Sequence, residues 1–166
     1  MTDFGKEYTV KDNFLDDIHL TLLDGLINNT YFPWYFQEEQ VAGADDGCWL
    51  SHKIYNDNAP QSDIYIPLID IFKNYLKCVS LCRITANLLL RQEYPSISDF
   101  HTDFEDEKIT TAIFYTNTNN GVTEIQGGDR IECVRNRLLM FPATTLHRAI
   151  GQTDTTKRVV LNFNFI

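Results

Sequence analysis

The first apolar repeat in the chain has the spacing of a helix. Residues 12–29 read DNFLDDIHLTLLDGLINN, and apolar residues recur there every four positions: Phe14, Ile18, Leu22 and Leu26. This spacing places them on one side of a helix. Asp12 or Asn13 is suited to cap the start of this helix, and Asp16 and Asp17 suit its first turn.

A second helix is predicted over residues 62–78, where similar spacing is seen for Ile66, Ile69, Phe72 and Leu76. Pro67 falls in the first turn of this helix, where proline is tolerated because the first backbone N–H groups have no partner within the helix.

From about residue 80 the pattern changes to short β-prone runs separated by turn signals. The runs are SLCRITANLLL, ITTAIFYTNT, VTEIQ, DRIECV, RLLMF and RVVLNFNFI, and the breaks between them include NTNNG, QGGD, VRNR and FPATT. Helices followed by strands indicate an α+β protein whose main body is an antiparallel sandwich or barrel.

The last run alternates most clearly, with Val159, Leu161, Phe163 and Phe165 on one face of the predicted strand. That face is apolar throughout and is expected in the core. The other face is mostly polar and begins with a positive charge: Arg158, Val160, Asn162 and Asn164. In a surface sheet such a face is simply solvated, whereas in a small barrel it lines a pocket. The pattern alone leaves both open.

Length, composition and charge narrow the class of protein. The chain has 166 residues, of which 43% are hydrophobic and 13% aromatic, as expected of one globular domain. The net charge of −9 makes nucleic acid an unlikely partner. Residues 1–80 carry 5 basic and 13 acidic side chains, against 9 and 10 in residues 81–166. An anionic small molecule is therefore better tolerated in the second half.

Targeting signals and cysteines add little. The N-terminus MTDFGKEYTV has no basic start followed by an apolar run, so we expect no signal peptide. No stretch approaches the roughly 18 apolar residues of a membrane span. The cysteines have no zinc-binding spacing and are expected as buried free thiols of a cytoplasmic protein: Cys48, Cys78, Cys82 and Cys133.

The stretch DFHTDFEDE contains the first candidate chemistry. If it is extended, His101 and Asp103 lie on the same face and both reach one ion, although an acidic solvated turn is an equal alternative. His147 follows 46 residues after His101, in FPATTLHRAI. Two histidines and one carboxylate form the facial triad of non-haem iron(II) enzymes. Zinc hydrolases also use such a set, so the ligands alone do not identify the metal.

Arg158 favours an anion-binding enzyme. An arginine that faces a barrel interior is costly unless an anion pairs with it, and its planar fork suits a carboxylate. Tyr115 alternates with Ile113 and Thr111 and could donate a phenolic hydrogen bond to the same anion, although on its own it would be taken as a core aromatic residue.

With these residues in place, the chain resembles the 2-oxoglutarate- and iron(II)-dependent dioxygenases of the compact, prolyl 4-hydroxylase-like kind, including small oxygenases of marine bacteria and their phages. The resemblance runs from Leu81 to Ile166 through FHTDF, TAIFYTNTNNGVT, NRLLMFPATTLHRAI and KRVVLNFNF. It departs from the prolyl hydroxylases in having NNGVTEIQGGD where a glycine pair follows the YTN strand, which weakens a peptide-substrate assignment.

The resemblance implies a site and a reaction. The iron(II) ligands would be His101, Asp103 and His147. The 2-oxoglutarate contacts would be Arg158, supported by Tyr115, with Asn87 and Asn162 as weaker candidates. Oxidative decarboxylation of 2-oxoglutarate by O₂ would be coupled to hydroxylation of an unidentified substrate. The alternatives are a non-catalytic jelly-roll metal-binding or interaction module and a cupin-type zinc hydrolase or isomerase.

The expected fold is therefore α+β and mainly β: a double-stranded β-helix, or jelly roll, with flanking amino-terminal helices. We expect a single domain over residues 1–166, in which residues 1–79 give helical support and substrate loops and residues 80–166 form the jelly-roll core. Residues 43–63 and 92–99 are long and polar, and are predicted to be loops that cover the substrate. If the chain is phage-encoded, the cytoplasm is that of the bacterial host.

Overall fold

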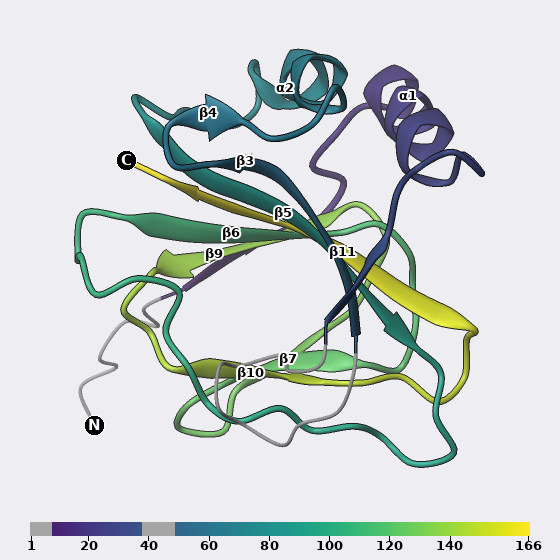
Figure 1. The fold of residues 1–166 in the computed structure, drawn as a ribbon. Coiled ribbons are helices and arrows are strands. Elements are labelled where there is room, and N and C mark those ends of the chain that lie inside the picture. Colours follow the sequence, from purple (N-terminus) through teal and green to yellow (C-terminus); the bar gives the residue numbers. More distant parts are fainter. Residues whose placement is uncertain (1–7, 38–48) are drawn as a thin grey trace.

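The computed structural model describes residues 8–37 and 49–166, and two antiparallel sheets dominate them (Figure 1). The main sheet has the strand order β1-β9-β6-β11-β5-β3-β2, with β4 paired to β3, and the minor sheet has the order β10-β7-β8. The main-sheet strands are β1 Thr9–Lys11, β2 Tyr35–Gln37, β3 Trp49–Asn56, β4 Ala59–Pro60, β5 Leu81–Leu90, β6 Thr110–Tyr115, β9 Arg137–Pro142 and β11 Lys157–Phe165. The minor-sheet strands are β7 Val122–Ile125, β8 Arg130–Glu132 and β10 His147–Ile150.

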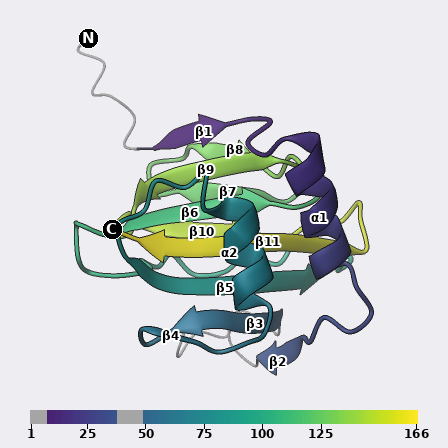
Figure 2. The same ribbon diagram turned by 90° about the horizontal axis from the view of Figure 1, so that it is seen from above.

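The two helices, α1 (Asp17–Ile27) and α2 (Tyr65–Phe72), cover the outer face of the main sheet, and the minor sheet lies across its other face (Figures 1 and 2). The larger hydrophobic core fills the layer between the helices and the sheet. Leu23 of α1 and Leu68 of α2 meet Phe114, Leu161 and other buried residues there. The main sheet therefore has one apolar face against the helices and one face toward the minor sheet.

The first helix begins later than predicted. Asp16 is its N-cap, and its side chain accepts a hydrogen bond from the backbone N–H of His19. Asn13 cannot serve as the cap because its φ of 51° places it in a left-handed conformation outside the helix. The predicted apolar stripe is only partly correct: Phe14 is buried and Leu26 packs against the core, whereas Ile18 and Leu22 are exposed. The buried stripe is Leu20, Leu23 and Ile27.

The second helix is shorter than predicted, but Pro67 does lie in its first turn. Ile66 is exposed, whereas Phe72 at the helix end is buried. Leu76 is also buried, although it lies beyond the helix in the following turn. The apolar spacing therefore marks the core residues near the end of the segment better than it marks the helix boundaries.

The strand predictions from residue 80 onward are confirmed, since all six runs contain a strand. Five strands were missed, namely β1 to β4 and β10. Residues 49–60 were predicted to be part of a substrate-covering loop, but they form β3 and β4, and β3 pairs with β5 over much of its length. Residues 43–48 of that predicted loop lie outside the described residues. Residues 92–99 are irregular, as predicted.

β11 lies at the centre of the main sheet, between β5 and β6. Its predicted alternation is confirmed: Val159, Leu161 and Phe163 are in the helix-side core. The alternate residues Arg158 and Asn162 line a pocket on the other side. The polar face of this strand is therefore interior and not solvated.

Neither helix in the described part of the chain combines the length and apolar character that a membrane crossing needs. Cys78, Cys82 and Cys133 are free thiols, as predicted, but only Cys133 is buried: Cys82 is half-buried and Cys78 is exposed. Cys48 lies outside the described residues.

Candidate metal centre

His101 and His147 are brought together by strand pairing. His147 is the first residue of β10, and His101 forms an isolated antiparallel bridge with it. The two residues exchange both backbone hydrogen bonds, each with an N···O distance of 3.0 Å. Residues paired in this way point their side chains to the same face, and the two imidazole centroids are 4.5 Å apart.

Each of these imidazoles has one nitrogen in contact with a backbone carbonyl. Nδ1 of His101 lies 3.2 Å from the carbonyl oxygen of Asp99, and Nδ1 of His147 lies 3.0 Å from that of Thr145. Because a carbonyl only accepts, Nδ1 is assigned the proton and Nε2 keeps its lone pair. Both Nε2 atoms are thereby available as metal ligands, with the outer hydrogen bond that metal-binding histidines commonly make.

Asp103 adds a carboxylate at the same place. One ligand atom from Asp103 and one from each histidine all lie within 4.8 Å of one another. Oδ2 of Asp103 accepts hydrogen bonds from the Thr111 hydroxyl at 2.7 Å and from the amides of Asn162 at 3.2 Å and Asn164 at 3.0 Å. Oδ1 accepts from Nη2 of Arg83 at 2.8 Å. Oδ1 therefore keeps more lone-pair capacity for a metal than Oδ2.

The surroundings of His147 and Asp103 favour the protonation states that a metal requires. Burial lowers the pKa of His147 and outweighs the opposite effect of the Asp103 carboxylate, which favours the neutral imidazole. Burial would raise the pKa of Asp103, but the Arg83 guanidinium, together with the hydrogen bonds from Asn164 and Thr111, overcomes this and lowers it. A neutral imidazole and an ionised carboxylate are the forms that bind divalent metals.

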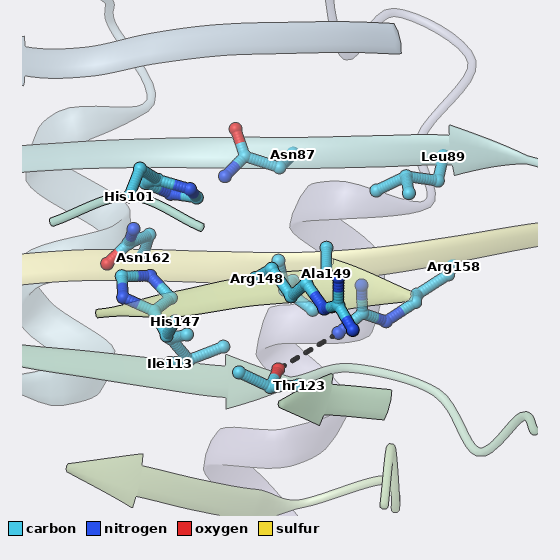
Figure 3. A pocket seen from close by; sticks show the side chains of 11 residues that line it. Asn87, Leu89, His101, Ile113, Thr123, His147, Arg148, Ala149, Arg158 and Asn162 are labelled. Carbon is cyan, nitrogen blue, oxygen red and sulfur yellow. Dashed lines mark hydrogen bonds between the residues drawn. The ribbon is translucent and has the colours of Figure 1, made fainter. Parts of the chain in front are cut away.

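A pocket extends from the two histidines to Arg158, between β5 and β11 of the main sheet and the minor sheet (Figure 3). Its lining includes Asn87 and Leu89 of β5, Thr123 of β7, Ala149 of β10, and Val160 and Asn162 of β11. In Figure 3, His101 and His147 lie on the left and Arg158 lies on the right. The two histidines of the triad and the predicted anion-binding arginine thus line one cavity.

Arg158 is almost completely buried, with 2% of its surface exposed. Its Nη2 donates to the Thr123 hydroxyl at 3.1 Å, and Nε has no hydrogen-bond partner. No carboxylate among the described residues forms an ion pair with it. A buried and unpaired guanidinium is costly, so this end of the pocket is complementary to an anion.

Two asparagine side chains also present unsatisfied atoms in this cavity. Oδ1 of Asn87 and Oδ1 of Asn162 are buried and have no hydrogen-bond partner. The amide of Asn162 is oriented by its Nδ2, which donates to the Asp103 carboxylate, so its oxygen is left as an acceptor. Unpaired buried polar atoms are uncommon in folded proteins. Three of the five side-chain atoms of this kind among the described residues belong to this cavity, those of Asn87, Asn162 and Arg158.

Tyr115 reaches the pocket indirectly. It is fully buried, and its hydroxyl donates to the Thr123 hydroxyl at 2.8 Å. Its ring lies 5.9 Å from the Arg158 guanidinium carbon. Burial raises the pKa of Tyr115 to about 12, so the phenol remains a donor. A direct bond from Tyr115 to an anion, as predicted from the sequence, would require its hydroxyl to turn away from Thr123.

Several residues of the site were missed from the sequence. Arg158 and Tyr115 both donate a hydrogen bond to the Thr123 hydroxyl. The Asp103 carboxylate accepts hydrogen bonds from Arg83, Thr111 and Asn164. Thr111 and Asn164 were placed on the correct strand faces, and that shared face was the available signal. Thr123 and Arg83 carried no local signal, because only the sheet pairing brings them to the pocket and the triad.

No family model matches the chain, and no curated protein matches its sequence. Solved structures do match. A 2OG-Fe(II) oxygenase family oxidoreductase from Burkholderia pseudomallei is 13% identical, with a TM-score of 0.64, over 96% of this chain and 85% of that one. A prolyl hydroxylase from Trichoplax adhaerens, in complex with a hypoxia inducible factor peptide fragment, is 16% identical, with a TM-score of 0.63, over 96% and 83%.

A third similar structure is the epimerase SnoN from nogalamycin biosynthesis, in complex with Fe³⁺, alpha ketoglutarate and nogalamycin RO. It is 14% identical, with a TM-score of 0.64, over 96% of this chain and 78% of that one. At these identities the likeness establishes the fold, which is the jelly roll of the 2-oxoglutarate and iron(II) oxygenases. The predicted fold class is therefore confirmed.

Proposed function

We propose that the chain is a non-haem iron(II) dioxygenase that couples oxidative decarboxylation of 2-oxoglutarate to hydroxylation of a substrate. The observation that carries this proposal is a cavity lined at one end by the two histidines of the His-Asp-His group and at the other by a buried Arg158 that has no ion-pair partner among the described residues. A dicarboxylate would be complementary to the chemistry of this cavity, with one carboxylate at the metal and the other at the arginine. The shared fold supports the same reaction class.

In this proposal the three ligands of iron(II) are His101, His147 and Asp103. Three protein ligands leave open positions for 2-oxoglutarate and O₂. The two imidazoles bind through Nε2 while their Nδ1–H groups donate to backbone carbonyls, which prevents ring rotation. When bound, the metal and 2-oxoglutarate supply the oxidising chemistry, and the chain supplies orientation and exclusion of water.

Arg158 and Thr123 hold the far carboxylate of 2-oxoglutarate, and Tyr115 orients the Thr123 hydroxyl by donating to it. Once Tyr115 donates to Thr123, that hydroxyl can turn its own proton toward the carboxylate. Asn87 and Asn162 complete the lining, and Asn162 presents an acceptor close to Asp103. The remaining partner is an unidentified substrate, and a cytoplasmic location and a single domain over residues 1–166 stay predictions.

A cupin-type zinc hydrolase has no need of a buried arginine at the far end of the pocket from the metal ligands, so the oxygenase is the better account. A non-catalytic module would have no need to leave Arg158 unpaired.

The test is anaerobic titration of the metal-free protein with iron(II) and then 2-oxoglutarate. We expect one iron per chain and a weak visible charge-transfer band when 2-oxoglutarate chelates the metal. His147→Ala should give neither. If the wild type binds iron but develops no band and shows no 2-oxoglutarate binding by calorimetry, the non-catalytic module replaces this proposal.

A further inference from the structure

A row of three polar side chains crosses the main sheet beneath Asp103. Thr111 of β6 is directly opposite Asn164 of β11, and Asn164 is directly opposite Arg83 of β5. Directly opposed residues of antiparallel strands share a face. All three side chains donate to the Asp103 carboxylate. The predicted metal ligand is therefore held by the sheet itself, and not by its own loop alone.

Arg83 differs from the other two because it brings a charge. Its Nη2 donates to Oδ1 of Asp103 at 2.8 Å, and its Nε donates to the Asn164 oxygen at 2.9 Å. The guanidinium carbon lies 4.9 Å from the ring centre of Phe104. The arginine side chain is 27% exposed and the Asp103 side chain 5% exposed. The ion pair is thus largely withdrawn from water, and charges interact more strongly in the protein interior than in water.

We propose that Arg83 is a positioning residue that neutralises Asp103 before the metal binds and thereby weakens the binding of the metal. The inference rests on the triad of the proposed function. Arg83 donates to Oδ1, the oxygen with the most remaining capacity for a metal, so a divalent cation bound there would share one carboxylate oxygen with the guanidinium. Two cations on one anion repel each other, and each lowers the affinity of the carboxylate for the other.

The other oxygen of Asp103 makes this inference testable. Oδ2 keeps its three donors when Arg83 is replaced, so the carboxylate remains oriented. A neutral side chain at position 83 should then have two opposite effects. The metal-free protein loses the counter-charge of a buried carboxylate and becomes less stable. The metal meets an uncompensated carboxylate and binds more tightly.

The experiment measures Mn²⁺ affinity by calorimetry and the melting temperature of the metal-free protein. Arg83→Met removes the charge and all donors, Arg83→Gln removes the charge but keeps a donor, and Arg83→Lys keeps the charge. We expect both neutral variants to bind Mn²⁺ about tenfold to a hundredfold more tightly than the wild type, with a lower melting temperature without metal. Arg83→Lys should stay close to the wild type. Arg91→Met, at an exposed arginine, is the matched control.

A purely structural arginine would give the reverse sign, since loosening Asp103 weakens the metal site. Unchanged or weaker Mn²⁺ binding in the neutral variants therefore overturns the inference, and Arg83→Gln decides if Arg83→Met does not fold. If the wild type binds no Mn²⁺, or if His147→Ala binds it equally well, the triad itself is wrong. The proposed function and this inference then fail together, whereas the first outcome leaves the proposed function intact.

Discussion

The two ends of the pocket are built differently. At the metal end, the Asp103 carboxylate accepts four hydrogen bonds, and Arg83 is paired with it. At the far end, Nε of Arg158 has no hydrogen-bond partner, and no carboxylate of the described residues forms an ion pair with Arg158. One arginine is satisfied by the protein, and the other is left for a ligand. The difference separates the part of the site that is organised in advance from the part that a cosubstrate completes.

The largest expected effect comes from removing a ligand at the organised end. His147→Ala should abolish stoichiometric iron(II) or Mn²⁺ binding, because it removes one of the three predicted ligands and leaves only His101 and Asp103. Metal content after dialysis measures this, with His52→Ala as the control for loss of a buried histidine outside the triad. Full retention of iron by His147→Ala would remove the triad assignment.

Replacement of the unpaired arginine should affect only the other end. Arg158→Ala should weaken 2-oxoglutarate binding by about tenfold to several hundredfold, since a charged hydrogen bond contributes about 1.5–3 kcal/mol and its loss leaves an anion unpaired. Mn²⁺ affinity should be nearly unchanged. Calorimetry on the manganese-loaded protein measures both values. Equal 2-oxoglutarate affinity in the variant and the wild type would show that the anion does not bind at Arg158.

Gly121 offers a subtler way to disturb the far end. A Cβ at this position would lie 2.9 Å from Asn119 Oδ1, 3.0 Å from Arg158 Cδ and 3.0 Å from the Ile150 carbonyl. Gly121→Ala should therefore displace the Arg158 stem and weaken 2-oxoglutarate binding several-fold, with about 1–3 kcal/mol of lost stability from overpacking. Gly25→Ala is the control, because a Cβ there meets nothing within 4 Å. Wild-type affinity in Gly121→Ala would mean that Arg158 tolerates the shift.

The smallest effect is expected for Tyr115→Phe, which removes one hydroxyl and leaves the ring in place. The loss of the hydrogen bond to Thr123 should cost about 0.5–1.5 kcal/mol, or roughly twofold to tenfold in 2-oxoglutarate affinity. Thr123→Val, measured beside it, removes the hydroxyl that contacts Arg158 itself. A larger effect in Tyr115→Phe than in Thr123→Val would indicate that the tyrosine, and not the threonine, contacts the carboxylate.

The sequence was most informative where chemistry and local pattern coincide. The His101-x-Asp103 spacing and the alternation of β11 are both local. The structure brings Asp103 together with the two histidines, and it places His101, His147 and Arg158 around one cavity. The supporting residues were not accessible in this way. Arg83 lies 20 residues from Asp103 in sequence, and only the sheet register brings them together.

The misplaced elements also have physical reasons. The segment of α1 contains apolar residues on more than one helical stripe, so spacing alone could not choose the stripe of Leu20 and Leu23 over that of Ile18 and Leu22. The segment of β3 was predicted to be a loop because residues 43–63 are long, polar and rich in turn residues. In the structure β3 also has a register shift against β5, between Lys53 and Tyr55.

The central position of β11 links folding to function. Odd-numbered residues such as Leu161 and Phe163 fill the helix-side core, and even-numbered residues such as Arg158 and Asn162 form the site. A slip of one residue in its pairing would send the arginine into the apolar layer and the phenylalanine into the cavity, at a large cost on both sides. The chain cannot acquire its core in one register and its site in another. Each correctly folded molecule therefore also has its site residues on the correct face of the sheet. A molecule with β11 in the wrong register is less stable.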